Sequence, residues 1–294
     1  MFINKDIFNM KCSVKKSILQ YSWLLSELRT VIGEKAKEIT TPSIIAGDAK
    51  GSMAVSLNGE VAHLARSNVL HLMAVAAELG NCYSIQRVFR EERIETKFHL
   101  AEFDLLDSVF VRSSLEDVMS FIEIMISKIR NRAVIEFGEE AVAPLAVKEF
   151  ARVDWKYVAK KIGGGEGQNI DDFSHEILYD VPYFITNLPC GQVSWALRDS
   201  EDGMKRSFNL IFPTSGEVVE GGERDLDGRQ MQLKFQRIGR YKQLGWYASA
   251  VSQIEGPAVS FGIGIERLAM WLFKKDDISD VNLFFRKLGF SEIH

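Results

Sequence analysis

Stretches that favour β-strands run through this chain in long series, with helices inserted between them at irregular intervals. Strands are expected at 83–89, 100–111, 181–188, 192–197, 206–212, 217–219 and 258–262. Because strand and helix do not alternate regularly, the order predicts an α+β fold, in which helices flank a central antiparallel sheet.

Apolar residues at helical spacing predict the helices. These cover 14–32, 64–79, 115–137, 226–238, a stretch from about 246, and 265–273. Ser113 and Glu116 fit a capping box before the third helix. Glu38–Ile45 reads as one strand, with Pro42 at an edge, an end or an interface.

The chain is long enough for one large domain or two ordinary ones. Its 294 residues contain no repeat and no Pro-rich linker, so a single domain over 1–294 is the simplest interpretation. The 36 basic and 40 acidic residues give a net charge of −4, which does not indicate a nucleic-acid partner.

Several classes of protein and site are disfavoured. No apolar run approaches the roughly 20 residues of a membrane span, and no signal-peptide core precedes residue 14. Cys12, Cys82 and Cys190 are an odd, widely spaced set, which fits neither a disulfide framework nor a zinc site. We therefore expect a reducing, cytoplasmic location and no membrane partner.

Three clusters of residues carry chemistry. The first is Phe89-Arg90-Glu91-Glu92, followed after a charged loop by His99, Glu102 and Phe103. A guanidinium for phosphate, a carboxylate for an amino group and a ring for a base suit a nucleotide. On these residues alone, a solvated charged hairpin is the simpler alternative.

Taken separately, the second and third clusters are also only weak evidence for a function. Glu217 and Glu220, within the stretch 217–224, suit Mg²⁺ carried by phosphates. A polar turn without a metal could have the same residues. Phe261 to Leu268 is a glycine-rich junction between strand and helix, where small residues and a helix N-terminus let an anion approach.

In this order and spacing, the clusters resemble the signature motifs of the class II aminoacyl-tRNA synthetases, in the aspartyl and asparaginyl branch. Thr41-Pro42 matches the end of motif 1, the first cluster matches motif 2, and Gly262 to Arg267 matches motif 3. Pro182 to Thr186 and Trp246-Tyr247 favour the asparaginyl side. The resemblance also extends to archaeal asparagine synthetase-related proteins, and motif 1 implies a homodimer.

The resemblance implies a role for each matching position. Arg90, Arg267 and Glu217 would be catalytic, and no protein nucleophile is implied. ATP would be bound by Arg90, Glu92, His99, Phe103, Glu217, Gly264 and Arg267. The acyl substrate would be bound by Lys50, Arg66, Ser67, Glu102, Arg224 and Gly262, and Mg²⁺ by Glu217 and Glu220.

The departures from the family pattern bear on substrate and partner. Only about 40 residues precede Pro42, so the family's anticodon-binding OB-fold is expected to be absent and ordinary tRNA charging is disfavoured. Lys50 stands where the family has a Glu for the substrate α-ammonium, and Val69 replaces a Gln. Either Lys50 points to solvent, or the substrate is not an unmodified α-amino acid.

The sequence therefore predicts an enzyme that uses ATP and Mg²⁺ to adenylate a carboxylic acid, releasing pyrophosphate and then AMP. The first hypothesis is amide formation, in which aspartate or a close analogue is passed to ammonia or an amine. The alternative is transfer of the acyl group to a protein, a carrier or a tRNA. A non-catalytic subunit is disfavoured because Arg90, Glu217 and Arg267 are all present.

Overall fold

A sheet of eight strands forms the centre of the molecule. The computed structural model describes residues 12–46, 51–91, 95–146, 149–162, 179–282 and 284–287. Across the sheet the order is β1 (Lys37–Glu38), β5 (Cys82–Phe89), β6 (Glu102–Val111), β11 (Ala258–Gly264), β10 (Gly216–Glu223), β9 (Ser207–Phe212), β8 (Tyr183–Thr186) and β7 (Ala151–Asp154). The middle pairs are antiparallel and the outermost pair at each edge is parallel, so the predicted α+β class is confirmed.

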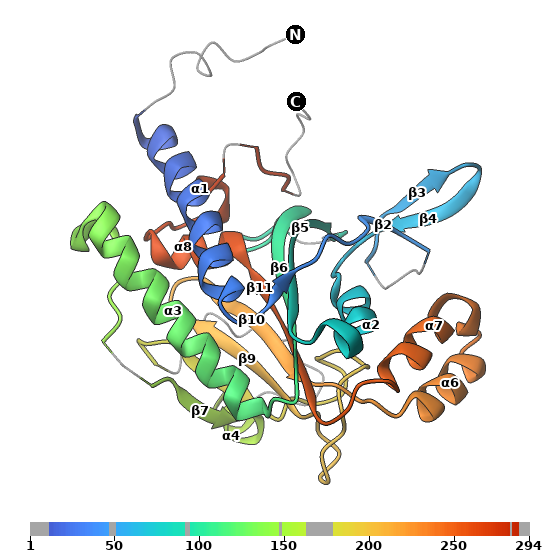
Figure 1. Ribbon diagram of the computed structural model, residues 1–294. Helices are drawn as coiled ribbons and strands as arrows, with labels where there is room; N and C mark the ends of the chain where they lie inside the picture. Colours follow the sequence, from blue (N-terminus) through green and yellow to red (C-terminus); the bar gives the residue numbers. More distant parts are fainter. Residues whose placement is uncertain are drawn as a thin grey trace.

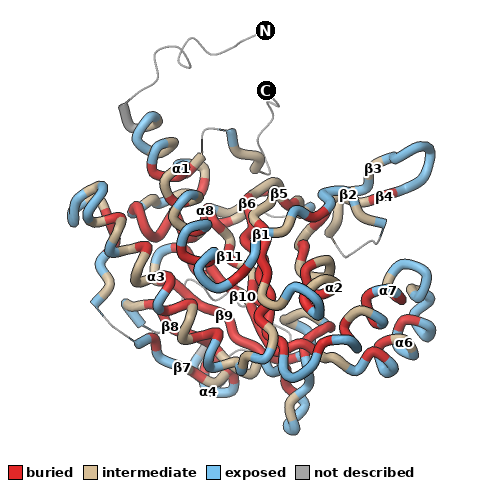
Figure 2. The backbone as a smooth tube through the Cα atoms, viewed as in Figure 1, coloured by how far each residue is buried: buried red, intermediate tan, exposed pale blue. Residues whose placement is uncertain are grey.

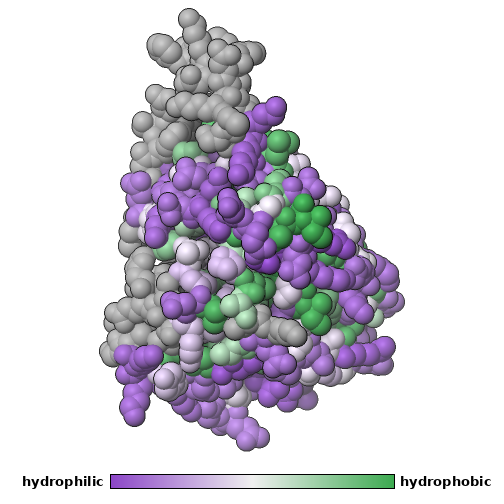
Figure 3. Space-filling model, turned by 90° about the vertical axis from the view of Figure 1, so that its left-hand side faces the viewer, coloured by the Kyte–Doolittle hydropathy of each residue, from purple (hydrophilic) through white to green (hydrophobic). Residues whose placement is uncertain are grey.

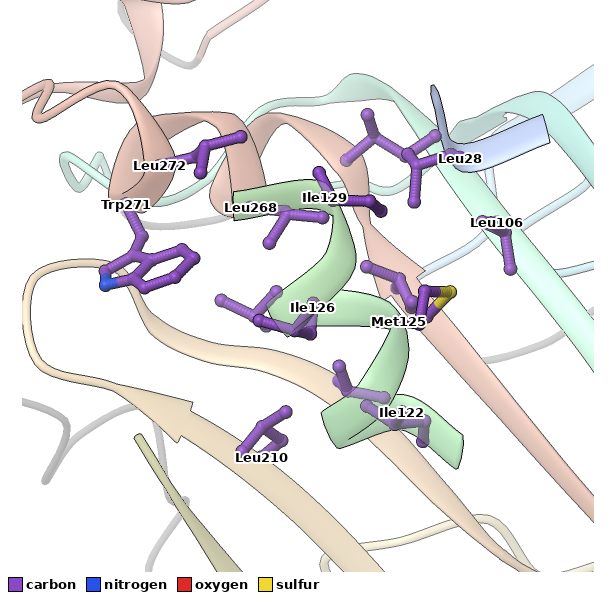
Figure 4. Close-up of a cluster of buried hydrophobic side chains, with 14 of the residues drawn as sticks. Leu28, Leu106, Ile122, Met125, Ile126, Ile129, Leu210, Leu268, Trp271 and Leu272 are labelled. Carbon is purple, nitrogen blue, oxygen red and sulfur yellow. The ribbon is translucent and has the colours of Figure 1, made fainter. Parts of the chain in front are cut away.

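Three helices cover one face of this sheet (Figure 1). They are α1 (Cys12–Gly33), α3 (Leu115–Phe137) and α8 (Ile265–Leu272). Their apolar faces meet the inner side chains of β6 and β9, as Figure 4 shows for Leu28, Ile126, Leu268, Leu106 and Leu210. Figure 2 shows the same division, because the strands and the inward sides of the helices are buried.

The outer sides of α1 and α3 are largely hydrophilic, with separate apolar patches (Figure 3). The exposed large apolar residues of these two helices are Leu19, Ile124 and Ile135.

The opposite face of the sheet carries α2 (Val69–Leu79), α6 (Gly228–Arg237) and α7 (Tyr241–Val251). A second apolar cluster joins these helices to Cys82 of β5 and Val109 of β6. Near the β7 edge, α4 (Trp155–Ile162) packs with β7 and β8 in a third cluster. The other helical turns in the described part of the chain are short 3-10 segments at Glu139–Ala141 and Ile278–Asp280.

A small antiparallel sheet, not predicted from the sequence, projects beside α2 (Figure 1). Its strands are β2 (Ile44–Ile45), β4 (Glu60–Leu64) and β3 (Ala54–Leu57), in that order. Asn58 and Gly59 join β3 to β4 with φ of 53° and 87°, the positive values that a tight hairpin turn requires.

Several local predictions were wrong, and the helix expected at 64–79 begins only at Val69, because Leu64 ends β4. The stretch 38–45 is not one strand: β1 ends at Glu38, and β2 begins at Ile44 in a different sheet, after Pro42. Residues 192–197 form no strand, only turns and one isolated bridge from Leu197 to Arg224. The capping box of α3 lies one residue later than predicted, at Ser114 and Asp117.

Among the described residues, no helix combines the length and the apolar character needed to cross a membrane.

Candidate active site

A cavity of about 1050 Å³ lies on the sheet face that carries α2 and α7. Strands β6, β10 and β11 form its floor, and the start of α8 and the loop before β6 close one end. The predicted site residues that line it are Arg66, Ser67, Arg90, His99, Phe103, Glu217, Glu220, Arg224, Gly262, Gly264 and Arg267. Residues distant in sequence therefore meet in one space large enough for a nucleotide and a small acid.

Two predicted residues, Lys50 and Glu92, lie outside the described residues. A third, Glu102, is described but does not line the cavity, so its predicted role in substrate binding stays a prediction without support from this geometry. The reason is the alternation of β6: Phe103, Leu105 and Asp107 face the cavity, and Glu102 faces the other way. Its carboxylate lies 3.7 Å from Arg87 Nη1.

Arg90 follows the last residue of β5 and reaches into the cavity. Its backbone N–H donates to Ala101 O at 2.9 Å, and its guanidinium lies 5.0 Å from the centre of the Phe103 ring. Its Nε is buried and has no hydrogen-bond partner among the described residues. A guanidinium fixed against a ring, with a buried N–H to offer, is suited to a phosphate or a carboxylate.

Arg267 connects three elements at one end of the cavity through its side-chain hydrogen bonds. From the first turn of α8 it donates to Phe98 O at 3.0 Å and to Glu217 O at 2.7 Å, and its Nη2 is 2.9 Å from His99 Nε2. Thr96 Oγ1 is 2.6 Å from His99 Nδ1. Because Arg267 can only donate, these contacts assign the proton of a neutral His99 to Nδ1. One side chain thus joins α8, β10 and the loop before β6.

Glu217 and Glu220 face the same side because β10 contains a bulge. Glu217 is opposite Ile211 and Glu220 is opposite Asn209. The partners are two positions apart on β9, although the glutamates are three positions apart on β10. Val218 is the extra residue of the bulge, and it is the reason that Glu217 and Glu220 point to the same side of the sheet. Both carboxylates therefore line the cavity.

The residues present fit a Mg²⁺ ion carried by phosphates. Asn209 Nδ2 donates to Glu217 Oε2 at 2.5 Å, while Asn209 Oδ1 is buried and has no hydrogen-bond partner among the described residues. Two carboxylates and a carbonyl oxygen are the hard donors that Mg²⁺ prefers, and it takes few of them when phosphates supply the rest. No larger group of His, Cys, Asp or Glu in the described part of the chain could hold a metal.

Asp107 is a cavity residue that no sequence motif pointed to. It is 3% exposed, and it accepts hydrogen bonds from Ser67 Oγ at 3.0 Å and from the Asn68 backbone N–H at 2.6 Å. Burial raises the pKa of Asp107 to about 6, against the opposing effects of those two donors and of the Arg224 and Arg90 charges. Counting in twos from Phe103 along β6 would have identified it.

Gly262 leaves the space that Asp107 occupies. The two residues are direct partners across β6 and β11, and a Cβ at position 262 would lie 3.2 Å from Asp107 Oδ1. Arg224 lies on the same floor, almost fully buried, and its Nε donates to Ser260 Oγ at 2.6 Å. An anionic and a cationic side chain therefore stand together on the cavity floor.

Comparisons with known proteins give a family match over nearly the whole chain. A family model described as tRNA synthetases class II (D, K and N) matches residues 10–287. The cytoplasmic asparagine–tRNA ligase of Saccharomyces cerevisiae is 27% identical over 90% of this chain, and the mitochondrial enzyme of Schizosaccharomyces pombe is 29% identical over 72%. The chain spans 53% and 50% of the lengths of these two relatives.

Solved structures show the same fold. The asparaginyl-tRNA synthetase of Entamoeba histolytica, in complex with asparaginyl-adenylate, has a TM-score of 0.87 at 22% identity, over 97% of this chain and 70% of its own. The Pyrococcus horikoshii asparaginyl-tRNA synthetase, also with asparaginyl-adenylate, has a TM-score of 0.85 at 21% identity, over 96% and 70%.

Proposed function

We propose, because this chain belongs to the class II tRNA synthetases (D, K and N), that it activates asparagine with ATP and transfers the asparaginyl group to a tRNA. The products of the two steps are pyrophosphate and AMP. The observation that carries the proposal is the placement of Asp107 and Arg224 on the floor of a cavity that Arg90, Arg267 and the two glutamates also line.

The floor of the cavity has the charges that an amino acid requires. Asp107 presents a buried carboxylate to the α-ammonium group, and Arg224 presents N–H donors to the side-chain carbonyl of asparagine. Because Asp107 supplies this anion, binding of an α-ammonium does not depend on residue 50. We therefore favour an unmodified α-amino acid as the substrate.

The activation step is nucleophilic attack by the amino-acid carboxylate on the α-phosphorus of ATP. Arg90 binds the oxygens on which negative charge increases, and the Phe103 ring on which it lies keeps it in place. Glu217 and Glu220, with Asn209, would hold Mg²⁺, which neutralises the outer phosphates when bound. The remaining contribution of the chain is positioning, by the contacts of Arg267.

Asparagine and tRNA are favoured over aspartate and ammonia by the relatives. The enzymes compared above are asparagine–tRNA ligases, and two of the solved structures contain asparaginyl-adenylate. These comparisons give no support to the first hypothesis, amide formation, and they favour the alternative of transfer to tRNA. The expectation that ordinary tRNA charging is unlikely rested on the expected absence of the anticodon-binding OB-fold and on the net charge, and the relatives do not support it.

Pyrophosphate exchange tests the activation step. We expect asparagine to support exchange with ATP and Mg²⁺, and aspartate to support it much less. Arg90→Ala should reduce exchange at least about 100-fold, the usual cost of removing one donor to developing charge. Arg112→Ala is the control, because Arg112 is an exposed arginine that pairs with exposed Glu255. Retention of exchange by Arg90→Ala would contradict the proposed role of the cavity.

The acceptor is tested separately with pre-formed adenylate. We expect the asparaginyl group to appear on tRNA, and addition of ammonia to leave the rate of adenylate consumption unchanged. Consumption that instead rises with ammonia and leaves tRNA uncharged would favour amide formation.

A further inference from the structure

On the α7 side, the cavity is lined by aromatic residues that have no role in the proposed binding of ATP and asparagine. Trp195 and Trp246 both line the cavity, yet they remain 37% and 41% exposed. Both pack edge to face against buried Tyr247, with ring centres 6.0 and 6.1 Å from it. Large aromatic faces that stay accessible at the mouth of a cavity are a place for a ligand to stack.

These aromatic rings are held in fixed orientations. Trp246 Nε1 donates to Gln243 O at 2.7 Å, and the His71 ring lies 5.4 Å from the Trp246 ring at an angle of 33°. Trp195 meets Phe235 of α6 edge to face at 5.3 Å. A flat group that stacks on either tryptophan would therefore meet a surface that is already ordered.

Helices α6 and α7, which carry Trp246 and pack against Trp195, are basic, although the whole chain is acidic. From Gly228 to Val251 there are five cationic residues and no acidic residue: Arg229, Lys234, Arg237, Arg240 and Lys242. Asp227, just before α6, is used as its N-cap and accepts from the Gln230 backbone N–H at 2.9 Å. The helix pair forms an edge of the molecule (Figure 1) and carries a positive charge.

Helical spacing places cations beside each tryptophan. Lys242 is four residues before Trp246, so the two share a face of α7. Lys234 Nζ lies 5.4 Å from the centre of the Trp195 ring, and Arg237, three residues later, lies on the same side of α6. Alternating cations and accessible rings are typical of surfaces that bind a single-stranded polynucleotide, where bases stack and phosphates pair with cations.

We propose that Trp195 and Trp246, with Lys234, Arg237 and Lys242, bind the single-stranded end of an RNA and lead it into the cavity. This inference rests on the proposed function, because it says where the acceptor strand lies. An acidic protein segment is disfavoured, since it would use the cations and leave both tryptophan faces uncovered.

Binding of a labelled single-stranded RNA of about 12 nucleotides, measured by anisotropy over a range of salt concentrations, tests the inference. Trp246→Ala and Trp195→Ala should each weaken binding about 5- to 150-fold, the measured range for one stacked base. The double variant Arg237→Gln/Lys242→Gln should make the slope of log K against log salt shallower by about 1.4, or about 0.7 for each phosphate that the variant no longer neutralises.

Matched controls lie on α4, where Lys160 and Lys161 are exposed and Tyr157 is 52% exposed. Tyr157→Ala and Lys160→Gln/Lys161→Gln should bind RNA as the unaltered chain does. Equal binding of duplex RNA, or of polyglutamate, would overturn the stacking surface, and so would unchanged binding by the tryptophan variants.

Pyrophosphate exchange separates this inference from the proposed function. Arg237→Gln/Lys242→Gln should leave exchange with asparagine unchanged, because neither residue lines the cavity. Normal exchange with unchanged RNA binding in this variant overturns the RNA surface alone. Absence of exchange in the unaltered chain overturns the proposed function, whatever the RNA results.

Discussion

At the scale of single residues, Asp107 is where stability and function oppose each other. Burial raises the pKa of Asp107 from 3.8 to about 6. A carboxyl group whose pKa is higher in the folded than in the unfolded state favours folding most below the unfolded value, and that contribution is lost as pH rises through 6. Above pH 6 the carboxylate therefore costs on the order of 3 kcal/mol of folding free energy.

Asp107→Asn should remove this cost and the substrate contact together. We expect an unfolding midpoint at pH 7.5 equal to or above that of the unaltered chain, and a KM for asparagine in exchange raised about 30-fold or more. In the unaltered chain, kcat/KM for asparagine should fall as pH is lowered through about 6, because a neutral carboxyl no longer pairs with an ammonium. The variant should lack this fall.

Glu102→Gln is the control on the same strand, since Glu102 faces away from the cavity. An unchanged KM in Asp107→Asn, or an equal rise in Glu102→Gln, would remove Asp107 from the substrate site.

The motif letters predicted most of the cavity residues but could not decide which side of β6 each one faces. Glu102 matches the motif and Asp107 was not singled out, yet Asp107 lines the cavity and Glu102 does not. Side chains of a strand point alternately to its two faces, so once Phe103 is known to line the cavity, Asp107 must line it too and Glu102 must not. The pairing of Glu217 with Glu220 was a reasonable expectation from composition, but simple alternation would have placed them on opposite sides.

At the scale of elements, the packing of α6 against α7 depends on a glycine. A Cβ at position 228 would clash with the backbone oxygen of Ala248 and would lie 2.9 Å from Ser252 Cβ. Backbone cannot rotate away as a side chain can. Gly228→Ala should therefore lower the free energy of unfolding by about 1–3 kcal/mol, measured by urea titration.

Gly33→Ala is the matched control, because it ends α1 and a Cβ there would meet nothing within 4 Å. That variant should be as stable as the unaltered chain or slightly more stable. If both alanine variants unfold at the same urea concentration as the unaltered chain, the contact between the two helices is looser than the structure indicates.

Elements with a strong periodic pattern were predicted well, and elements defined by distant contacts were not. The range of α3 was predicted correctly, because 23 residues of helical spacing leave little choice. The apolar residues of 192–197 suggested a strand, but Trp195 packs against α6 and α7, which the local sequence cannot indicate. The start of α7 was placed five residues too late, since Tyr241, Lys242 and Gln243 are polar or exposed.

At the scale of the whole molecule, one buried polar network joins α1, β6 and α8. Tyr21 donates to Asp104 Oδ2 at 2.8 Å, and the Asp104 backbone N–H donates to both oxygens of Glu266 at 3.0 and 3.1 Å. Burial, and secondarily the Asp104 charge, raises the pKa of Glu266. Burial and the two carboxylates raise the pKa of Tyr21, so its hydroxyl remains a donor.

Tyr21→Phe should therefore destabilise the whole chain by about 1–3 kcal/mol, the cost of a buried acceptor that loses a donor. Urea unfolding should show a lower midpoint with the same dependence on denaturant. Tyr157→Phe, at an exposed tyrosine of α4, should have no effect. Equal stability of Tyr21→Phe and the unaltered chain would mean that the network contributes nothing.

Mean properties of the chain were informative for fold class and misleading for partners. Composition and element order predicted an α+β domain, because burial of a core depends on totals. The net charge of −4 argued against nucleic acid, yet it averages over a molecule in which five cations gather on one helix pair. Binding depends on where charges are concentrated, and a sum over the sequence does not contain that information.

The bulge at Val218 has a consequence for comparing this chain with others. Removing one residue between the two glutamates of β10 would remove the bulge and leave the glutamates two positions apart, where regular alternation again places both carboxylates on the same side of the sheet. An alignment gap of one position within this stretch is therefore compatible with the same pair of metal ligands. Homologues are best compared by strand register, not by percentage identity.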